Sequence, residues 1–279
     1  MKLSEAFELY KNNFILMANQ SRRVVEMHDY VLKNMVGFFG DIEMSKLTID
    51  QISEWKRTIE RTRSENTVRV YVLRLRNVVH YLNKLKEDCL DVDLIPVPKR
   101  HDTVPVFLTE KEVAEMIECS SSIRTKFVIS LLYASGIRLS EFISLNRGQI
   151  VEKRFTVIGK GGKARLCFID QRTEDLMNEY LATRNDRCDA LVVSYEHKQR
   201  MTATNIQLLV RNAAARACLT KKVTPHTLRH SYATNFLKNN GNMRYLSQSM
   251  GHSSMDTTAI YAHVVDADLE AQYRKYHTI

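Results

Sequence analysis

The chain has 279 residues, of which 44% are hydrophobic and 26% charged, so it is long enough for one large globular domain or two ordinary ones. Its formal charge of +9 favours a polyanionic partner or an anionic membrane surface. No stretch reaches the about 18 apolar residues that cross a bilayer, and the N-terminus lacks an apolar signal region, so we expect no membrane partner and a cytoplasmic location.

The N-terminal third of the chain has the apolar periodicity of helices and few residues that break them. Ser21 and Thr48 are suitable N-caps for two of the helices. In the last helix Arg69 and Arg76 share a face outside the apolar stripe. This pair is either a solvated face or a surface that contacts nucleic-acid phosphates. The predicted helices span residues 4–18, 22–38, 48–62 and 66–86.

The helical pattern breaks after residue 90. Pro96, Pro98 and Pro105 disfavour helix, and the run Lys99-Arg100-His101 between the last two is polar and basic. We expect an extended interdomain linker, with a simple surface loop as the alternative. The predicted boundaries are an N-terminal helical domain over 1–98, a linker over 99–106 and a second domain over 107–279.

The second domain mixes helices with a β-hairpin. Thr109 and Glu112 form a capping box for a helix that runs to about residue 119. The turn Gly159–Lys163 joins two β-rich segments. The predicted strands are 154–158 and 165–169, with a short third at 191–193, and the predicted helices are 123–134, 171–183, 202–218, 225–239, 243–250 and 266–276. The expected fold class is mainly α with a small β-hairpin in the C-terminal domain.

A few polar residues indicate the chemistry. His226 and Arg229 lie three apart on one helix and share a face. His252 and Tyr261 follow them, and Arg138 lies upstream. A phenol is a poor nucleophile at neutral pH, because its pKa lies about three units higher. It becomes effective where cations hold a phosphorus centre and absorb the developing charge. The set predicts a metal-free attack on a phosphodiester that joins the protein covalently to it.

Four segments resemble tyrosine recombinases of the phage-integrase group, most closely the two-domain Xer-type members. A His-x-x-Arg spacing alone would be weak, but all four segments occur in the family's order. They are Ser135–Glu141, Gly159–Arg165, His226–His230, and Met250–His252 together with Tyr261–His263. The resemblance implies an N-terminal four-helix SAM-like core-binding domain and a C-terminal α+β catalytic domain.

The resemblance also implies roles for five of these residues. Arg138 and Arg229 clamp the nonbridging phosphate oxygens, a task that suits the planar fork of arginine. His226 helps to accept the tyrosine proton, and His252 donates a hydrogen bond to the phosphate. Tyr261 is the nucleophile, and its product is a 3′-phosphotyrosine beside a free 5′-hydroxyl.

Three basic residues of the hairpin complete the predicted site. The family motif has its catalytic lysine directly after the first glycine, which selects Lys160 as the acid for the leaving 5′-oxygen. Lys163 and Arg165 are expected to contact backbone phosphates. The alternative is a hairpin whose basic side chains are merely solvated.

The predicted tail helix bears an apolar stripe of Leu269, Tyr273 and Tyr276. It could fold onto its own domain. In the resembled family it docks into a neighbouring protomer, which implies exchange in trans within a tetramer on two DNA duplexes. The expected partner is therefore a double-stranded DNA recombination site and a homo-oligomer of the chain.

Three functions remain open from the sequence. The first is site-specific recombination, either Xer-like resolution of chromosome dimers or integration and excision of mobile elements. The others are a type IB-like topoisomerase and a non-catalytic DNA-binding regulator. The five cysteines are scattered, without a Cys-x-x-Cys pair, so no metal site is expected. No cofactor is expected either, since the phosphotyrosine bond conserves the energy that rejoining needs.

Overall fold

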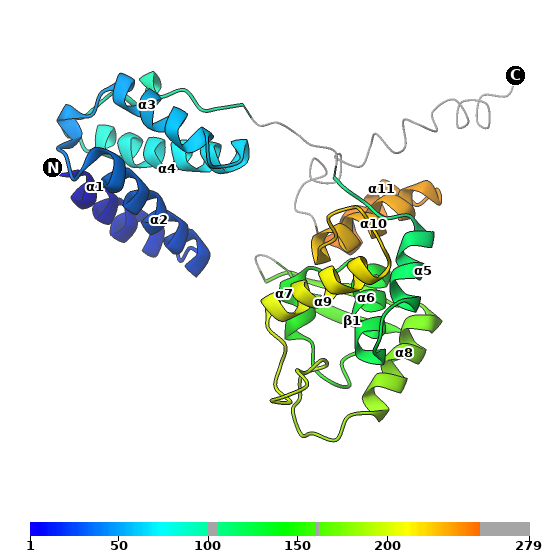
Figure 1. Cartoon of the computed structure of the whole chain (residues 1–279). Helices are drawn as coiled ribbons and strands as arrows, with labels where there is room; N and C mark the ends of the chain where they lie inside the picture. The colour runs from blue at the N-terminus through cyan, green and yellow to red at the C-terminus, as the bar shows by residue number, and fades with distance from the viewer. Residues whose placement is uncertain (100–104, 160–161, 252–279) are drawn as a thin grey trace, which may run out of the picture. The chain divides into compact units, whose positions relative to one another are not determined.

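The computed structural model describes residues 1–99, 105–159 and 162–251. The chain divides into two compact units, Met1–Thr103 and Val104–Ile279 (Figure 1). Each unit has its own hydrophobic core. Within the described ranges, no helix is both long enough and apolar enough to cross a membrane.

Helices make up the N-terminal unit. Its core includes Trp55 and Tyr71, both fully buried, and Ile95 belongs to the same core. Short π and 3-10 helices lie at 11–16, 44–46 and 92–94. The α-helices are α1 (Leu3–Tyr10), α2 (Arg22–Phe39), α3 (Ile49–Glu60) and α4 (Glu65–Lys84).

Most predicted helix ends in this unit agree with the structure to within two residues, because local caps determine them. Thr48 forms a capping box with Gln51 at the start of α3, and α2 ends at Gly40 with a positive φ of 73°. The exception is the first helix, which was predicted to run unbroken over 4–18. It changes to a π-helix after Tyr10, a change too short for apolar periodicity to reveal.

The second unit is built around α6, whose middle part is buried on all sides. Consecutive residues such as Phe127, Val128 and Ile129 are all fully buried, and α6 packs against α5, α8, α9 and α10. The helices are α5 (Glu110–Glu118), α6 (Ile123–Ser135), α7 (Leu139–Ser144), α8 (Gln171–Ala182), α9 (Ala203–Arg216), α10 (Pro225–Lys238) and α11 (Met243–Met250).

The described β-structure of this unit is a single antiparallel hairpin. Strand β1 (Arg154–Ile158) pairs with β2 (Ala164–Phe168), in a register that joins Arg154 to Phe168 and Ile158 to Ala164. The expectation of a mainly helical chain with a small β-hairpin is confirmed. The suggested third strand at 191–193 is wrong, since the chain there makes only isolated bridges, Asn146 to Ala190 and Val193 to Arg200.

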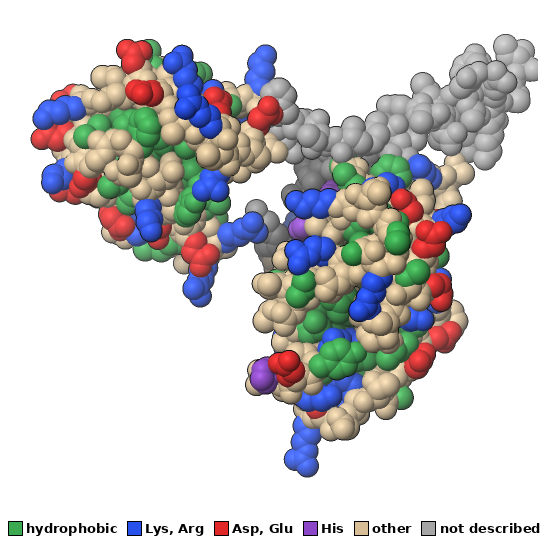
Figure 2. Space-filling view, in the orientation of Figure 1, with side chains coloured by type: hydrophobic (Ala, Val, Ile, Leu, Met, Phe, Trp, Pro, Cys, Tyr) green, Lys and Arg blue, Asp and Glu red, His purple; other side chains and the backbone are tan. Residues whose placement is uncertain are grey.

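Basic and acidic side chains are interspersed on the face shown in Figure 2. On that face the positive charges do not gather into one large patch in either unit. On this face, charge alone therefore does not locate a functional site, and the contacts of individual arginines are more informative.

Candidate active site

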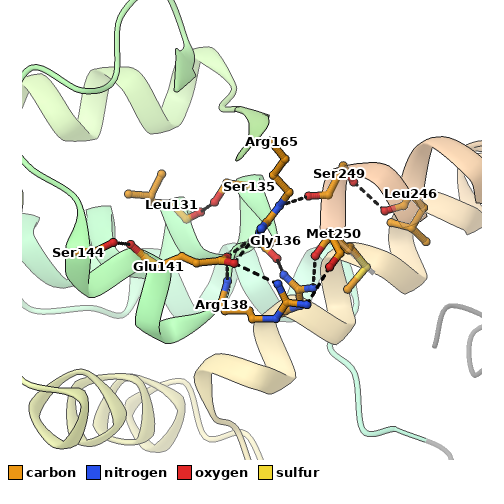
Figure 3. Close-up of polar contacts among 12 residues, drawn as sticks. Leu131, Ser135, Gly136, Arg138, Glu141, Ser144, Arg165, Leu246, Ser249 and Met250 are labelled. Carbon is orange, nitrogen blue, oxygen red and sulfur yellow. Dashed lines mark hydrogen bonds and ion pairs between the residues drawn. The ribbon is translucent and has the colours of Figure 1, made fainter. Parts of the chain in front are cut away.

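Three arginines from distant parts of the sequence meet at the C-terminal end of α11. Arg138 lies between α6 and α7, Arg165 lies on β2, and Arg229 lies on α10. The last carbonyls of a helix have no intrahelical donor and carry the negative end of its dipole, so guanidinium groups fit there. The three donate, in that order, to the carbonyl oxygens of Gly251 at 3.1 Å, Ser249 at 2.8 Å and Met250 at 2.6 Å (Figure 3).

Glu141 joins two of these arginines. Its carboxylate is 5% exposed and accepts a bidentate pair from Arg165, Nη1 to Oε1 at 2.8 Å and Nη2 to Oε2 at 2.6 Å. Arg138 donates to the same carboxylate from Nη1 at 3.0 Å and from its backbone N–H at 2.7 Å. Figure 3 shows Glu141 lying between the two guanidinium groups.

This pairing keeps the carboxylate charged. Burial opposes ionisation of Glu141, but the hydrogen bonds from Arg165 and Arg138 outweigh it, so the pKa of Glu141 lies below its ordinary value. For Arg165, burial is likewise outweighed by Glu141, and the pKa of its guanidinium is raised. At neutral pH the cluster therefore holds three positive charges and one negative charge.

A sharp turn after α6 brings Arg138 to the cluster. Gly136 ends α6 in the left-handed conformation, with φ +59°. A Cβ at this position would lie 2.3 Å from Cδ1 of Tyr232, so glycine alone fits without displacement. The carbonyl of Gly136 accepts a hydrogen bond from Nη1 of Arg229. Gly136 thus ends α6 and also accepts a hydrogen bond that anchors Arg229.

The local sequence also explains the start of α10. Thr224 caps the helix and Pro225 occupies its first turn. His226 follows as an exposed residue, whereas Arg229, one turn later, is 5% exposed. The guanidinium of Arg138 is more accessible, with 29% of its side chain exposed. Arg138 is therefore the arginine of this cluster best able to reach an external anion.

His230 follows Arg229 and remains neutral. Burial, together with the neighbouring His226 and Arg229, lowers the pKa of His230 to about 4. A neutral imidazole beside the buried guanidinium adds no further repulsion.

The structure does not describe every predicted site residue. Lys160, His252, Tyr261 and the expected tail helix over 266–276 lie outside the described ranges. Lys163 is exposed at the end of the hairpin turn, as a residue that contacts phosphate would be. Arg165 was also expected to contact a backbone phosphate. Its side chain, however, is 9% exposed and turns inward to Glu141.

Arg69 and Arg76 also contact the protein itself. Arg69 donates from Nη1 to the carbonyl of Pro98 at 2.8 Å. Arg76 donates from Nη1 to the carbonyl of Ile95 at 2.5 Å and to that of Val92. Both side chains hold the segment that follows α4 against the helix, an arrangement that the spacing of the two arginines could not indicate.

Glu141 was not among the predicted site residues, although a local signal existed. It occupies the third position of α7, where a glutamate commonly accepts a hydrogen bond from the residue before the helix. Its second partner, Arg165, is 24 positions away and is known only from the fold. Among the described residues, no group of three or more His, Cys, Asp or Glu could hold a metal ion.

The chain resembles known proteins in sequence and in fold. The model of the phage integrase family matches residues 106–268. The tyrosine recombinase XerD of Oceanobacillus iheyensis is 31% identical over 229 residues, which cover 77% of each chain. A crystal structure of XerA recombinase is 25% identical, covers 99% of both chains and has a TM-score of 0.56. A post-cleavage complex of XerH with its palindromic difH substrate has a TM-score of 0.74 and covers 97% of this chain and 83% of that one; at 20% identity it shows the fold alone.

Proposed function

The chain belongs to the phage integrase family and is a site-specific tyrosine recombinase related to the Xer enzymes, and we propose that Tyr261 is its nucleophile. The phenol oxygen attacks the scissile phosphorus, forms the 3′-phosphotyrosine bond and displaces the 5′-oxygen, which takes a proton from Lys160. In strand exchange, a 5′-hydroxyl attacks the phosphotyrosine and returns Tyr261 to its free form. The family and its relatives favour recombination over a topoisomerase or a regulator.

The charge of the arginine cluster supports this chemistry. Three guanidinium groups against the single carboxylate of Glu141 leave two positive charges in excess. A phosphodiester carries one negative charge, and attack by a phenolate raises it to two in the pentacovalent intermediate. Charges that are already in position stabilise the intermediate more than the ground state. In this proposal Arg138 and Arg229 hold the phosphate oxygens, His226 accepts the tyrosine proton and His252 donates to the phosphate.

Duplex DNA is the proposed partner. XerH, a structural neighbour, was solved with its difH substrate. We propose that residues 1–98 form the core-binding domain, that 99–106 form the linker and that 107–279 carry the chemistry. Lys163, exposed on the hairpin, is proposed to contact a backbone phosphate. Contact of Arg69 and Arg76 with DNA would require them to exchange their carbonyl partners for phosphate oxygens.

A nicked suicide duplex carrying the recombination site tests the nucleophile. Wild-type protein should form a covalent adduct in the presence of EDTA, and Tyr261→Phe should bind the duplex without forming one. Tyr245→Phe is a matched control, because Tyr245 is exposed on α11 and should be dispensable. An undiminished adduct from Tyr261→Phe would show that another residue attacks, and adduct formation that requires added metal would exclude the metal-free mechanism.

The assembly is proposed to be a tetramer on two duplexes, with the predicted tail helix exchanged between protomers. Truncation after Val265 removes that helix from the sequence. The truncated chain should bind one site as the full chain does but fail to form the two-duplex complex in sedimentation experiments. A normal two-duplex complex would exclude exchange of this segment as the basis of assembly.

A further inference from the structure

Arg165 has little capacity left for a phosphate. Its Nη1 and Nη2 both donate to Glu141, and its Nε donates to the carbonyl of Ser249 at 2.8 Å. The side chain also lies against Gly251, where a Cβ would stand 2.9 Å from Nη1. With 9% of the side chain exposed, Arg165 donates to the protein from each of its three guanidinium nitrogens.

These contacts connect three separate elements. From β2, Arg165 reaches Glu141 on α7, and Glu141 holds Arg138 through two hydrogen bonds. Arg165 and Arg138 then hold two carbonyls at the end of α11, those of Ser249 and Gly251 (Figure 3). The hairpin strand, the proposed phosphate clamp and the turn that precedes His252 in sequence are thereby joined through one ion-pair network, whose carboxylate is buried.

We propose that Arg165 is a positioning residue for the cleavage reaction and not a DNA contact. Arg165 neutralises part of the negative charge of Glu141, so the guanidinium of Arg138 is held less tightly and can attract the substrate phosphate. Arg165 also fixes the last turn of α11. The proposal rests on the function assigned above to Arg138. It replaces the expectation from sequence that Arg165 contacts a backbone phosphate.

The expected effect of losing Arg165 follows from the two arginines that Glu141 binds. With Arg165 present, the carboxylate divides its hydrogen bonds between two guanidinium groups. Without Arg165, Arg138 becomes its sole cationic partner among these contacts, and the buried carboxylate holds that guanidinium more tightly. One positive charge is also lost from the cluster. Both effects weaken stabilisation of the pentacovalent intermediate more than they weaken binding of intact DNA.

Two measurements separate positioning from phosphate contact. Loss of one phosphate contact reduces the slope of log affinity against log salt by about 0.9. The rate of adduct formation in a single turnover at saturating DNA reports the chemical step. Arg165→Met should leave the salt slope unchanged and slow adduct formation by roughly tenfold to a hundredfold. A slope reduced by about 0.9 with an unchanged saturated rate would overturn the proposal.

The hairpin offers two comparison variants. Lys163→Met should reduce the salt slope, as expected for an exposed lysine that contacts phosphate. Arg154→Met should change neither quantity, because Arg154 pairs with Glu152 at the far end of β1 and is 59% exposed. Arg165→Lys should recover part of the rate, since lysine restores the charge but not the bidentate fork. A rate for Arg165→Lys equal to that of Arg165→Met would show that the charge has no role.

A double variant addresses loss of folding. In Arg165→Met the buried carboxylate of Glu141 keeps only one arginine partner, which can unfold the domain. Combining Arg165→Met with Glu141→Gln removes the negative charge of that carboxylate. The double variant restores the net charge of the cluster and should melt higher than the single one. It should still cleave more slowly than the wild type, because the contact of Arg165 with the carbonyl of Ser249 is lost. Recovery of the full wild-type rate would mean that Arg165 only balances the charge of Glu141 and positions nothing, against the proposal. If wild-type protein forms no adduct at all, the proposed function fails, and the salt slope still decides whether Arg165 contacts DNA.

Discussion

Replacing Gly136 with alanine tests the turn that brings Arg138 to the cluster. Gly136 has φ +59°, and a Cβ there would meet Cδ1, Cε1 and Cγ of Tyr232 at 2.3, 2.7 and 2.9 Å. No real Cβ tolerates such distances, so the ring or the backbone must move. Because the carbonyl of Gly136 also accepts from Arg229, movement of the backbone would disturb the proposed phosphate clamp.

The size of the effect follows from two contributions. An alanine in the left-handed region costs about 1–2 kcal/mol, and forcing additional volume into a packed site costs about 1–3 kcal/mol. We therefore expect the free energy of unfolding of the catalytic unit to fall by about 2–5 kcal/mol. For a unit of this size, each kcal/mol lowers the melting temperature by about 2–4 °C. The expected loss is roughly 4–20 °C.

Gly148 provides a matched control. It also has a positive φ, +72°, but nothing lies within 4 Å of its Cβ position. Gly148→Ala should show only the backbone contribution, about 1–2 kcal/mol. The difference between the two variants therefore isolates the overlap with Tyr232.

Circular dichroism follows unfolding of both units, whereas tryptophan fluorescence reports the N-terminal unit alone. The chain contains 1 tryptophan, and Trp55 is fully buried in the N-terminal core. Gly136→Ala should lower the melting transition of the catalytic unit, and it should slow adduct formation at saturating DNA. Equal losses of stability in Gly136→Ala and Gly148→Ala would refute the steric argument.

Three further predictions concern pH, the first unit and the thiols. Because the pKa of His230 is lowered to about 4 from its ordinary 6.5, the unfolded chain binds a proton below pH 6.5 that the folded chain does not. The stability contributed by neutral His230 is thus fully present above pH 6.5 and is lost as the pH falls toward 4. The melting temperature of His230→Gln should therefore depend less on pH between these values than that of the wild type. An identical pH dependence would exclude a contribution of His230. Arg76→Gln should lower the unfolding free energy of the N-terminal unit by about 1–3 kcal/mol, as followed by Trp55 fluorescence, whereas Arg57→Gln, on the exposed face of α3, should change it little. Burial raises the pKa of the Cys167 thiol to about 11, so maleimide should label the exposed Cys119 and Cys218 first; rapid labelling of Cys167 in folded protein would contradict its burial.

Local sequence was sufficient for most of the secondary structure. The predicted helix 243–250 and strand 154–158 match the observed elements at both ends. Caps and apolar periodicity involve neighbours a few residues apart, so the chain carries them without reference to its fold. The helix α7 was not predicted as a separate element, because six residues are too few for a periodic pattern to be recognised.

Residue types and their spacing also indicated the chemistry. Arg138, His226 and Arg229 were selected from motifs, and the structure brings Arg138 and Arg229 to adjacent carbonyls of one helix end. The motifs likewise indicated the family that the comparisons show. The catalytic assignments of all six residues stay predictions, and three of these residues, Lys160, His252 and Tyr261, lie outside the described ranges.

What each arginine contacts was decided by the tertiary structure. In sequence, Arg165 and Lys163 are neighbouring basic residues of one hairpin, yet one binds buried Glu141 and the other is exposed. Arg69 and Arg76 likewise turn to the carbonyls of residues 92–98. Charge and spacing are properties of the chain, but the partner of a long, flexible cation depends on which groups folding brings within about 3 Å of it.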